Sequence, residues 1–290
     1  MVNNYWSPAT LCNRPLETAF ARDGFAVLES FVDKVELKEI VPLIESILTS
    51  SREMACTRPH NTLVPLRWND PIVGLLLTSD RRVQTLTNVL CADDLKWISG
   101  YISIKEPYSP PLWWHQDWWC WDHPATYLRM PMQIAVLCYL ADTNVQNGAL
   151  RVLPGSHLKS APIHAILPEA HGHSAEELEP GHAALDDLSG QETLCLRAGD
   201  AVAIDYRLLH GTHGNACGIR RDCILLSFTP SWQGLPNDIK AHLIAHPAQP
   251  SAGEASETTC VAAKLLPEFS GPRHDLPLNR NAPSNFEVVD

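Results

Sequence analysis

The sequence predicts a mainly β fold with flanking α-helices, whose core is an antiparallel sandwich or barrel of the jelly-roll type. Six short runs between residues 95 and 229 are rich in β-branched and aromatic residues and are separated by turn signals. These runs are KWISGYISI, MQIAVLCYL, ALRVL, TLCLR, AVAIDYRLL and CILLSFT. Two of the turns are explicit, Asn147-Gly148 and Pro154-Gly155-Ser156. A jelly roll is the commonest way to close such a set of strands when few helices intervene.

The segment before these strands is predicted to be mixed. A proline start and a glycine stop bracket a helix at residues 15–23, and FAVLESF follows as a short strand. Asp33 is placed to cap the helical pattern VELKEIVPLIESIL, in which we expect Pro42 to cause a kink or a restart. A further helix is predicted at residues 81–90.

No linker, charge block or internal repeat divides the chain, so we expect a single domain over residues 1–290. Its parts are a helical and mixed region at 1–94, a β core at 95–232 with an insertion at about 158–192, and an irregular, proline-rich C-terminal extension at 245–290. Long insertions of this kind are either lids and binding loops or surface excursions, and both remain open here.

Composition excludes several classes of protein. The 22 Lys and Arg against 33 Asp and Glu give a net charge of −11, which argues against a nucleic-acid or anionic-membrane surface. The longest apolar run, residues 134–141, is too short to span a bilayer, and the N-terminus has no basic-then-apolar leader. Nine cysteines without a CxxC pair indicate reduced thiols rather than disulfides or a zinc ribbon. We therefore expect a cytoplasmic protein.

The strongest chemical motif is the H-x-D pair His115 and Asp117 in PPLWWHQDWWCW. On a strand, residues i and i+2 project from the same face, so the imidazole and the carboxylate would converge. His210 directly follows AVAIDYRLL and shares the parity of its apolar row, so we expect it to point into the core. Two imidazoles and one carboxylate make a facial triad, which is typical of non-haem Fe(II) oxygenases. His213 is the alternative to His210, although it lies off this row.

An oxygenase of this type also needs a cation for the distal carboxylate of a 2-oxo acid, which either Arg220 or Arg221 could provide. Parity cannot choose between them because both faces of the following strand are apolar. A His-rich metal tract is conceivable at His171, His173 and His182, but the surrounding Gly, Ser and Glu favour a solvated loop.

Three ordered motifs, HQD at 115–117, QNGALRVLPGSH at 146–157 and HGTHGNACGIRR at 210–221, resemble the phytanoyl-CoA dioxygenase family of Fe(II)- and 2-oxoglutarate-dependent oxygenases. The resemblance implies a double-stranded β-helix, the cupin-like form of the jelly-roll barrel. It implies Fe(II) bound by His115, Asp117 and His210, with 2-oxoglutarate as co-substrate and O2 as oxidant.

The resemblance also implies which residues hold the co-substrate. It favours Arg221 over Arg220 for the C5 carboxylate, and it places the Thr212 hydroxyl near the same carboxylate. Gln133 occupies a position that often lines the co-substrate pocket. Because related halogenases lack the acidic ligand, Asp117 favours hydroxylation over chlorination.

Five of the nine tryptophans lie between residues 113 and 121, around the predicted metal ligands. Alternation places Trp113, Trp119 and Trp121 on the face of His115, and His123 follows closely, so these four are candidate substrate contacts. Core packing is the competing interpretation. The resulting hypothesis is hydroxylation of an unactivated C–H bond of a small molecule in specialised metabolism.

Other outcomes remain open with the same cofactors, namely desaturation, epimerisation or ring formation. Outside this class, a non-catalytic jelly-roll binding module or a zinc hydrolase could use the same scaffold. An acyl-CoA substrate is disfavoured, because the segments assigned to the mouth of the site are aromatic and acidic rather than basic. A neutral or cationic substrate is expected instead.

Overall fold

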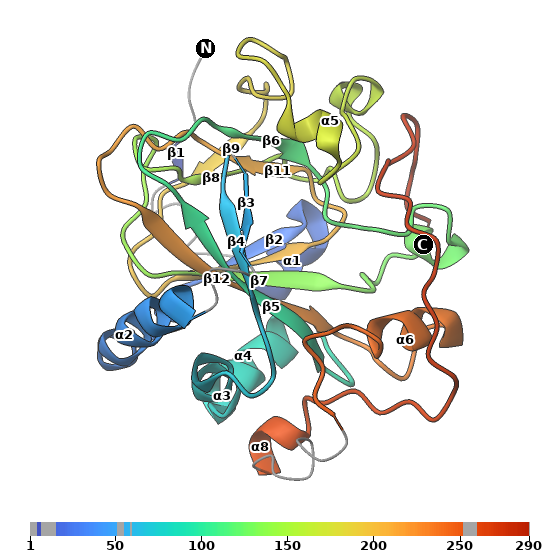
Figure 1. The fold of residues 1–290 in the computed structure, drawn as a ribbon. Coiled ribbons are helices and arrows are strands. Elements are labelled where there is room, and N and C mark those ends of the chain that lie inside the picture. Colours follow the sequence, from blue (N-terminus) through green and yellow to red (C-terminus); the bar gives the residue numbers. More distant parts are fainter. Residues whose placement is uncertain (1–4, 7–15, 51–54, 59, 252–259, 290) are drawn as a thin grey trace.

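A computed structural model describes residues 5–6, 16–50, 55–58, 60–251 and 260–289, which fold around two β-sheets (Figure 1). The strands are β1 (Tyr5–Trp6), β2 (Phe25–Leu28), β3 (Cys56–Thr57), β4 (Thr62–Leu66), β5 (Lys96–Lys105), β6 (Leu112–His115), β7 (Ile134–Tyr139), β8 (Leu150–Val152), β9 (Glu192–Leu194), β10 (Ala201–Asp205), β11 (His210–Thr212) and β12 (Arg221–Thr229). Seven of them pair in the order β2-β10-β7-β12-β5-β4-β3, and five pair in the order β1-β9-β8-β11-β6.

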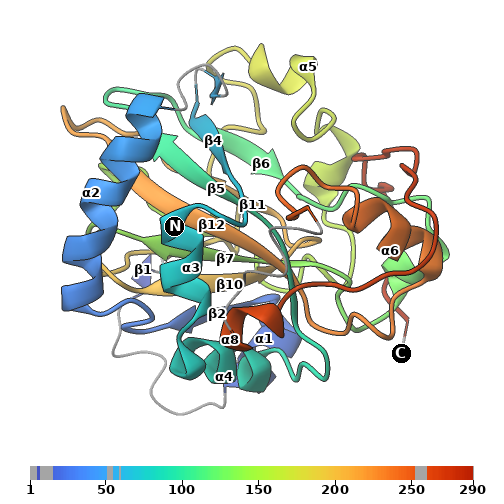
Figure 2. The same cartoon turned by 60° about the horizontal axis from the view of Figure 1, so that its bottom comes forward.

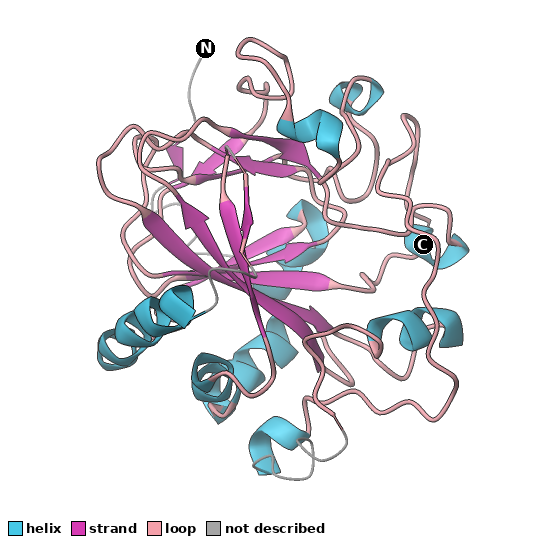
Figure 3. Ribbon diagram, viewed as in Figure 1, coloured by secondary structure: helices cyan, strands magenta, loops and turns pink. Residues whose placement is uncertain are grey.

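The sheets are antiparallel except for the parallel pair β1–β9. Each sheet ends in edge strands, so the hydrogen-bond ladders form two open sheets and not a closed barrel (Figure 3). The predicted mainly β class is confirmed, and each of the six predicted runs contributes a strand.

Helices cover the outer face of the seven-stranded sheet (Figures 1 and 2). They are α1 (Leu16–Asp23), α2 (Lys34–Ser50), α3 (Pro71–Leu77) and α4 (Asp80–Val89). Along β7, Ile134, Val136 and Cys138 join the cluster beneath these helices, whereas Ala135, Leu137 and Tyr139 join the cluster between the sheets. A strand buried on both faces needs apolar residues at every position, which accounts for its unbroken apolar run.

The predicted cap of α2 is confirmed in detail. The Asp33 carboxylate accepts from the backbone N–H groups of Val35 and Glu36 at 2.8 and 2.9 Å, and the Glu36 carboxylate accepts from the Asp33 N–H at 2.9 Å. This reciprocal arrangement is a capping box. The helix continues through Pro42 without a restart. Pro42 and Lys38 are exposed, so water can satisfy the carbonyl that proline leaves without a donor.

The remaining helices are α5 (His173–Glu176), α6 (Asn237–Leu243) and α8 (Cys260–Ala263), with 3-10 turns at Pro124–Tyr127 and Pro162–Ala165. The insertion packs on the five-stranded sheet. Trp114 donates its backbone N–H to Ala184 O and its indole N–H to Asp186 O, both at 2.8 Å. Residues 260–289 run past α6, where Phe286 packs on Trp121 with ring centroids 4.7 Å apart (Figure 1).

Among the described residues, none of the helices is long and apolar enough to cross a membrane. Most of the N-terminal segment on which the leader expectation depends lies outside the described residues, as do Cys12 and part of the C-terminal extension.

The turn before β10 is tightly packed around Gly199. Its φ of +94° is unfavourable for other residues, and a Cβ there would overlap the carbonyl oxygen of Val32. Gly181 has a similar φ of +92° with nothing within 4 Å of its Cβ position. We expect Gly199→Ala to reduce the free energy of unfolding by about 3 kcal/mol or more, and Gly181→Ala by about 1 kcal/mol. Urea denaturation of both variants measures the difference, and equal losses would contradict it.

Candidate metal centre

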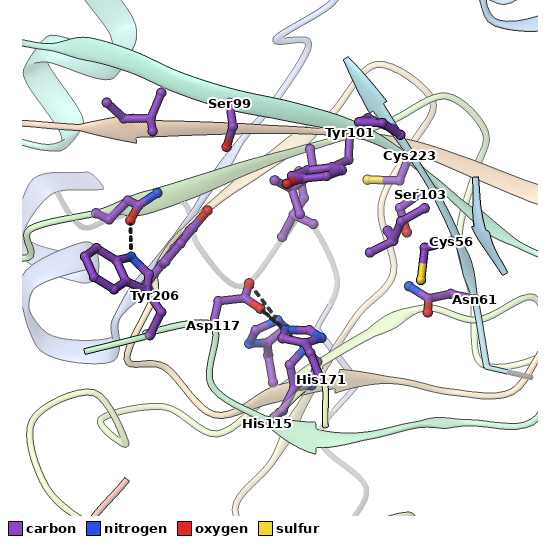
Figure 4. A pocket seen from close by; sticks show the side chains of 18 of the residues that line it. Cys56, Asn61, Ser99, Tyr101, Ser103, His115, Asp117, His171, Tyr206 and Cys223 are labelled. Atoms are coloured by element: carbon purple, nitrogen blue, oxygen red, sulfur yellow. Dashed lines mark hydrogen bonds and ion pairs between the residues drawn. The ribbon is translucent and has the colours of Figure 1, made fainter. Parts of the chain in front are cut away.

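Two histidines are brought together by strand pairing. His115 ends β6 and is directly opposite His210, the first residue of β11. Their rings lie 4.2 Å apart between centroids, and both side chains are buried. Asp117 lies two residues beyond β6, with Oδ1 3.6 Å from His115 Nε2 and Oδ2 3.6 Å from His210 Nε2. Figure 4 shows His115 and Asp117 converging at one end of a cavity.

The ring nitrogens of both histidines are oriented as metal ligands require. Nδ1 of His115 lies 2.9 Å from Trp113 O, and Nδ1 of His210 lies 3.0 Å from Leu208 O. A carbonyl only accepts, so both Nδ1 atoms carry the proton and both Nε2 atoms keep a lone pair. The network therefore assigns the tautomer that binds metal in both rings.

The charge state of the site is also suited to a cation. Burial lowers the pKa of His115 well below its ordinary value, so this imidazole is neutral. Burial alone would raise the pKa of Asp117, but its interactions with His210, His171 and His115 hold that pKa well below the usual range. A neutral imidazole and an ionised carboxylate are the forms that ligate metal. Two such imidazoles with one carboxylate fit a non-haem Fe(II) centre.

The route by which these residues meet differs from the strand alternation that the sequence suggested. β6 ends at His115, and β10 ends at Asp205, so neither Asp117 nor His210 continues the expected row. A turn at residues 206–209 instead carries the chain into the other sheet. The backbone N–H of Trp118 donates to Tyr206 O at 2.9 Å and ties the two loops together. The expected convergence is observed, but the expected strand geometry is wrong.

A second polar group lies at another part of the cavity. Arg221 opens β12 directly opposite Lys105, and both side chains are buried. The Arg221 guanidinium donates to Gly148 O at 2.9 Å and lies 5.2 Å above the Tyr139 ring. Among the described atoms, Arg221 Nε and Thr212 Oγ1 are buried without a hydrogen-bond partner. Arg220, by contrast, points away and pairs with Glu45 and Asp222.

Lys105 adds a second basic group that the sequence analysis missed. Its ammonium donates to His60 O at 2.8 Å and to Pro110 O. Burial, together with the charges of Arg221 and Arg151, lowers the pKa of Lys105 to about 6. At neutral pH the Lys105 amine is therefore mostly uncharged, and a bound anion would raise its pKa and restore its charge. Arg221, Lys105 and the free Thr212 hydroxyl together form a site for an anion. The signal was present in β5, where a row of alternating polar residues faces the cavity: Ser99, Tyr101, Ser103 and Lys105.

The aromatic candidates separate into two groups. Trp119 lines the cavity, stacks 4.2 Å from His242, and donates its indole N–H to Gln133 Oε1 at 2.8 Å. Gln133 lines the cavity too, and its amide donates to Ser227 Oγ at 2.6 Å.

The other three candidates lie outside the cavity lining. Trp113 packs on His60, Trp121 packs on Phe286, and His123 caps a 3-10 turn and lies 3.3 Å from Asp238. Trp121 and His123 lie beyond His115, where β6 has ended, so strand alternation does not place them on the metal-facing side. Trp113 does share the face of His115, with ring centroids 6.0 Å apart, but it packs on His60 and does not line the cavity.

The cavity between the two sheets has a volume of about 530 Å³, within the usual range for small-molecule sites. Its basic lining residues are Arg58, Lys105, Arg221 and Arg280, and its acidic ones are Asp117 and Asp275. The expectation of an acidic mouth is therefore wrong. The overall charge of the chain reflects its outer surface and not the surface that faces a ligand.

His171 is the main correction within the insertion. It was expected in a solvated loop, but its Nε2 lies 2.8 Å from Asp117 Oδ1 (Figure 4), and its Nδ1 lies 3.0 Å from Arg58 Nη1. Ligand atoms of His115, Asp117 and His171 all lie within 4.8 Å of one another. His173 does conform to expectation, since its side chain is 83% exposed. A contact between residues 54 positions apart has no local signal in the sequence.

Comparison with known proteins places this geometry in context. The profile of the family described as Phytanoyl-CoA dioxygenase (PhyH) matches residues 20–223. The ectoine dioxygenase of Nocardia farcinica (strain IFM 10152) is 24% identical over 228 residues, which cover 73% of this chain and 76% of that protein.

Two solved structures share the fold. EctD from S. alaskensis with 2-oxoglutarate and 5-hydroxyectoine has a TM-score of 0.55 at 20% identity, over 77% of this chain and 78% of that one. The epimerase SnoN in complex with Fe3+, alpha ketoglutarate and nogalamycin RO has a TM-score of 0.55 at 18% identity, over 81% of this chain and 90% of that one. These similarities confirm the predicted jelly-roll architecture.

The ligand assignment predicts the behaviour of two nearby histidines. His210→Ala removes an Nε2 lone pair from the centre, so we expect it to weaken Fe(II) or Co(II) binding by more than about 100-fold, the upper cost of losing an outer partner alone. His213→Ala is the matched control, because His213 instead bonds Thr193 Oγ1 at 2.9 Å. Anaerobic metal titration against a competing chelator measures both affinities. Loss of affinity in the His213 variant instead would reverse the assignment.

Proposed function

The chain belongs to the phytanoyl-CoA dioxygenase family of Fe(II)- and 2-oxoglutarate-dependent oxygenases, and we propose that it hydroxylates an unactivated C–H bond of a small molecule. One observation carries the proposal: the buried His115 and His210 and the partly buried Asp117 share a single cavity with the buried Arg221. Such an enzyme needs both a metal with open positions and an anion site for the co-substrate.

In this proposal His115, Asp117 and His210 hold the iron, which supplies the activation of O2 coupled to decarboxylation of 2-oxoglutarate to succinate and CO2. One oxygen atom enters succinate and the other enters the substrate as a hydroxyl. Arg221 and Lys105 bind the distal carboxylate of 2-oxoglutarate, and the free Thr212 hydroxyl donates a hydrogen bond to it. The remaining wall orients the substrate and excludes water.

Hydroxylation is favoured by two features. Asp117 fills the position that a halogenating relative would leave open, and the curated relative is a dioxygenase of ectoine. Epimerisation is the second candidate, because the structural neighbour SnoN is an epimerase. That neighbour was solved with nogalamycin RO, which supports a substrate from specialised metabolism for this chain as well.

The lining of the cavity suggests the substrate class. Arg280 lines it near Tyr101, Tyr206 and His242, and among the described residues no carboxylate pairs with its guanidinium. An unpaired guanidinium in a ligand cavity suits an acidic group on the ligand. We therefore revise the expected neutral or cationic substrate to a small molecule that carries a carboxylate or another anionic group. The cavity volume, rather than charge, disfavours a whole acyl-CoA.

The organisation of the chain as one domain and its location in the cytoplasm remain part of the proposal. The cysteines described with their side chains are all free, namely Cys56, Cys91, Cys120, Cys138, Cys195, Cys217 and Cys223. Free thiols in this number are typical of proteins from a reducing compartment.

The two adjacent arginines give a matched test of co-substrate binding. Arg221→Ala removes the buried guanidinium, so we expect the KM for 2-oxoglutarate to rise by about 100-fold, the loss of a charge-assisted hydrogen bond of about 2–3 kcal/mol. Arg220→Ala removes only an outer ion pair and should leave that KM within about twofold. Succinate release and the visible charge-transfer band of the anaerobic Fe(II) and 2-oxoglutarate mixture are the readouts. No band in the wild-type protein, or equal effects in both variants, would refute the proposal.

The substrate class is tested with two arginines of the C-terminal segment. Succinate release is screened with metabolites that carry an anionic group and with their amide or ester analogues. We expect stimulation by acidic compounds only, and we expect Arg280→Gln to lose it while the slow 2-oxoglutarate turnover without substrate is retained. Arg273→Gln is the control, because Arg273 is exposed and outside the cavity lining. Stimulation by the neutral analogues alone would contradict an anionic substrate.

A further inference from the structure

Three histidines surround Asp117, but their second ring nitrogens face different partners. Nδ1 of His115 and of His210 face backbone carbonyls, which accept. Nδ1 of His171 faces Arg58 Nη1 at 3.0 Å, and a guanidinium only donates. Nδ1 of His171 must therefore be the acceptor, and the proton of this ring lies on Nε2. That Nε2–H points at Asp117 Oδ1 at 2.8 Å, as a hydrogen-bond donor and not as a lone pair.

The position of the ring proton distinguishes His171 from the metal ligands. Its closeness to them would by itself suggest another ligand. Ligand atoms of His115, Asp117 and His171 cluster within 4.8 Å, as they would around an ion. A protonated Nε2 cannot bind a cation, and the tautomer that could bind one would place an N–H against the Arg58 donor. The hydrogen bonds thus favour the set with His210.

The Arg58 side chain is itself held by a residue of the insertion. Its guanidinium lies 2.8 Å from the Glu176 carboxylate, and its backbone N–H donates to Asn61 O at 3.0 Å. Its side chain is only 12% exposed. Glu176 and His171 both belong to the insertion, so Arg58 contacts the insertion at two residues.

The backbone of His171 supports a positioning role. Its φ of +61° lies in the left-handed region, where residues other than glycine are uncommon. Such a conformation persists where the surrounding contacts determine it, and it occurs preferentially at functional sites. Here the contacts are the two hydrogen bonds of the ring, one to Asp117 and one to Arg58.

We propose that His171 is a positioning residue for the metal centre, which holds the Asp117 carboxylate by Nε2–H donation and thereby couples closure of the insertion to metal binding. The inference rests on the proposed function, since it assumes that Asp117 is a metal ligand. Hydrogen bonds to a ligating carboxylate fix its orientation and raise metal affinity. Because coupling is reciprocal, a metal bound by Asp117 in this orientation also stabilises the docked insertion.

Metal affinity of four proteins tests the positioning role. We expect His171→Ala to bind Fe(II) or Co(II) about 10- to 100-fold more weakly than the wild type, the usual cost of losing an outer partner of a ligand. His171→Gln should recover most of the affinity, because a glutamine amide can donate to Asp117 and accept from Arg58. His173→Ala is the matched control from the same insertion, with its imidazole exposed and paired only with Glu177.

Two spectroscopic measurements separate positioning from ligation and from folding. Electron spin-echo modulation of the Cu(II)-loaded protein counts bound imidazoles, and we expect two in the wild type and two in His171→Ala. Hydrogen exchange of residues 158–192 should slow when metal is added to the wild type and to His171→Gln, but not when it is added to His171→Ala.

The outcomes are distinct. Three imidazoles in the wild type and two in His171→Ala would make His171 a ligand and overturn the inference. Unchanged affinity in His171→Ala, or exchange that slows equally in that variant, would also overturn it. If the wild type binds no metal, or if His210→Ala binds it equally well, the proposed function fails instead.

Discussion

The partly buried, ionised carboxylate of Asp117 is the constraint on which the rest of the site depends. Moving a carboxylate out of water costs on the order of several kcal/mol unless partners compensate it. Here the carboxylate is surrounded by imidazoles of three separate segments: the end of β6, the start of β11 and the insertion. Without a cation, only the Nε2–H of His171 donates to this carboxylate among the described residues. The hydrogen bonds alone therefore leave the Asp117 carboxylate only partly compensated, and a bound metal ion would complete the compensation.

A second electrostatic cost is placed in the same cavity. Lys105 and Arg221 lie opposite each other in adjacent strands and both are buried, where two positive charges are unfavourable, so the pKa of Lys105 falls to about 6. Their hydrogen bonds go mainly to neutral backbone carbonyls. An arrangement that lowers stability in this way persists where a ligand offsets it, and a dicarboxylate would neutralise the pair. Apolar clusters pack on both faces of the seven-stranded sheet, so the unfavourable burial of basic groups is limited to the cavity.

The sequence predicted which residues form the ligand set but not how they meet. His115, Asp117 and His210 followed from residue type and order, and the resemblance to a family selected Arg221. The connecting geometry was wrong, because no local pattern shows that β10 stops at Asp205 and that a turn leads into the other sheet. The strand expected around His115 ends earlier than alternation along it assumed, and the short strand β11 was missed, since three or four residues carry too little periodicity.

His171 shows the same limit in sharper form. A histidine among Gly, Ser and Glu has the composition of a solvated loop, and only the folded insertion brings it to Asp117. Lys105 differs, because it ends a strand whose polar residues alternate, so the signal existed and was overlooked. Contacts within one element can thus be predicted from periodicity, whereas contacts between an insertion and the core depend on how the whole chain packs.

The clustered tryptophans explain how the insertion is positioned. Trp113 and Trp114 immediately precede His115 on β6. Trp113 packs on Ala175 and Ala184 of the insertion, and Trp114 binds the same segment through backbone and indole hydrogen bonds. The strand that presents His115 to the cavity therefore also anchors the segment that carries His171. A shift of the insertion along β6 would move His171 relative to Asp117 without disturbing His115 or His210. Because Trp113 and Trp114 are consecutive residues of β6, their side chains leave opposite faces of the strand and contact the insertion in two separate apolar clusters.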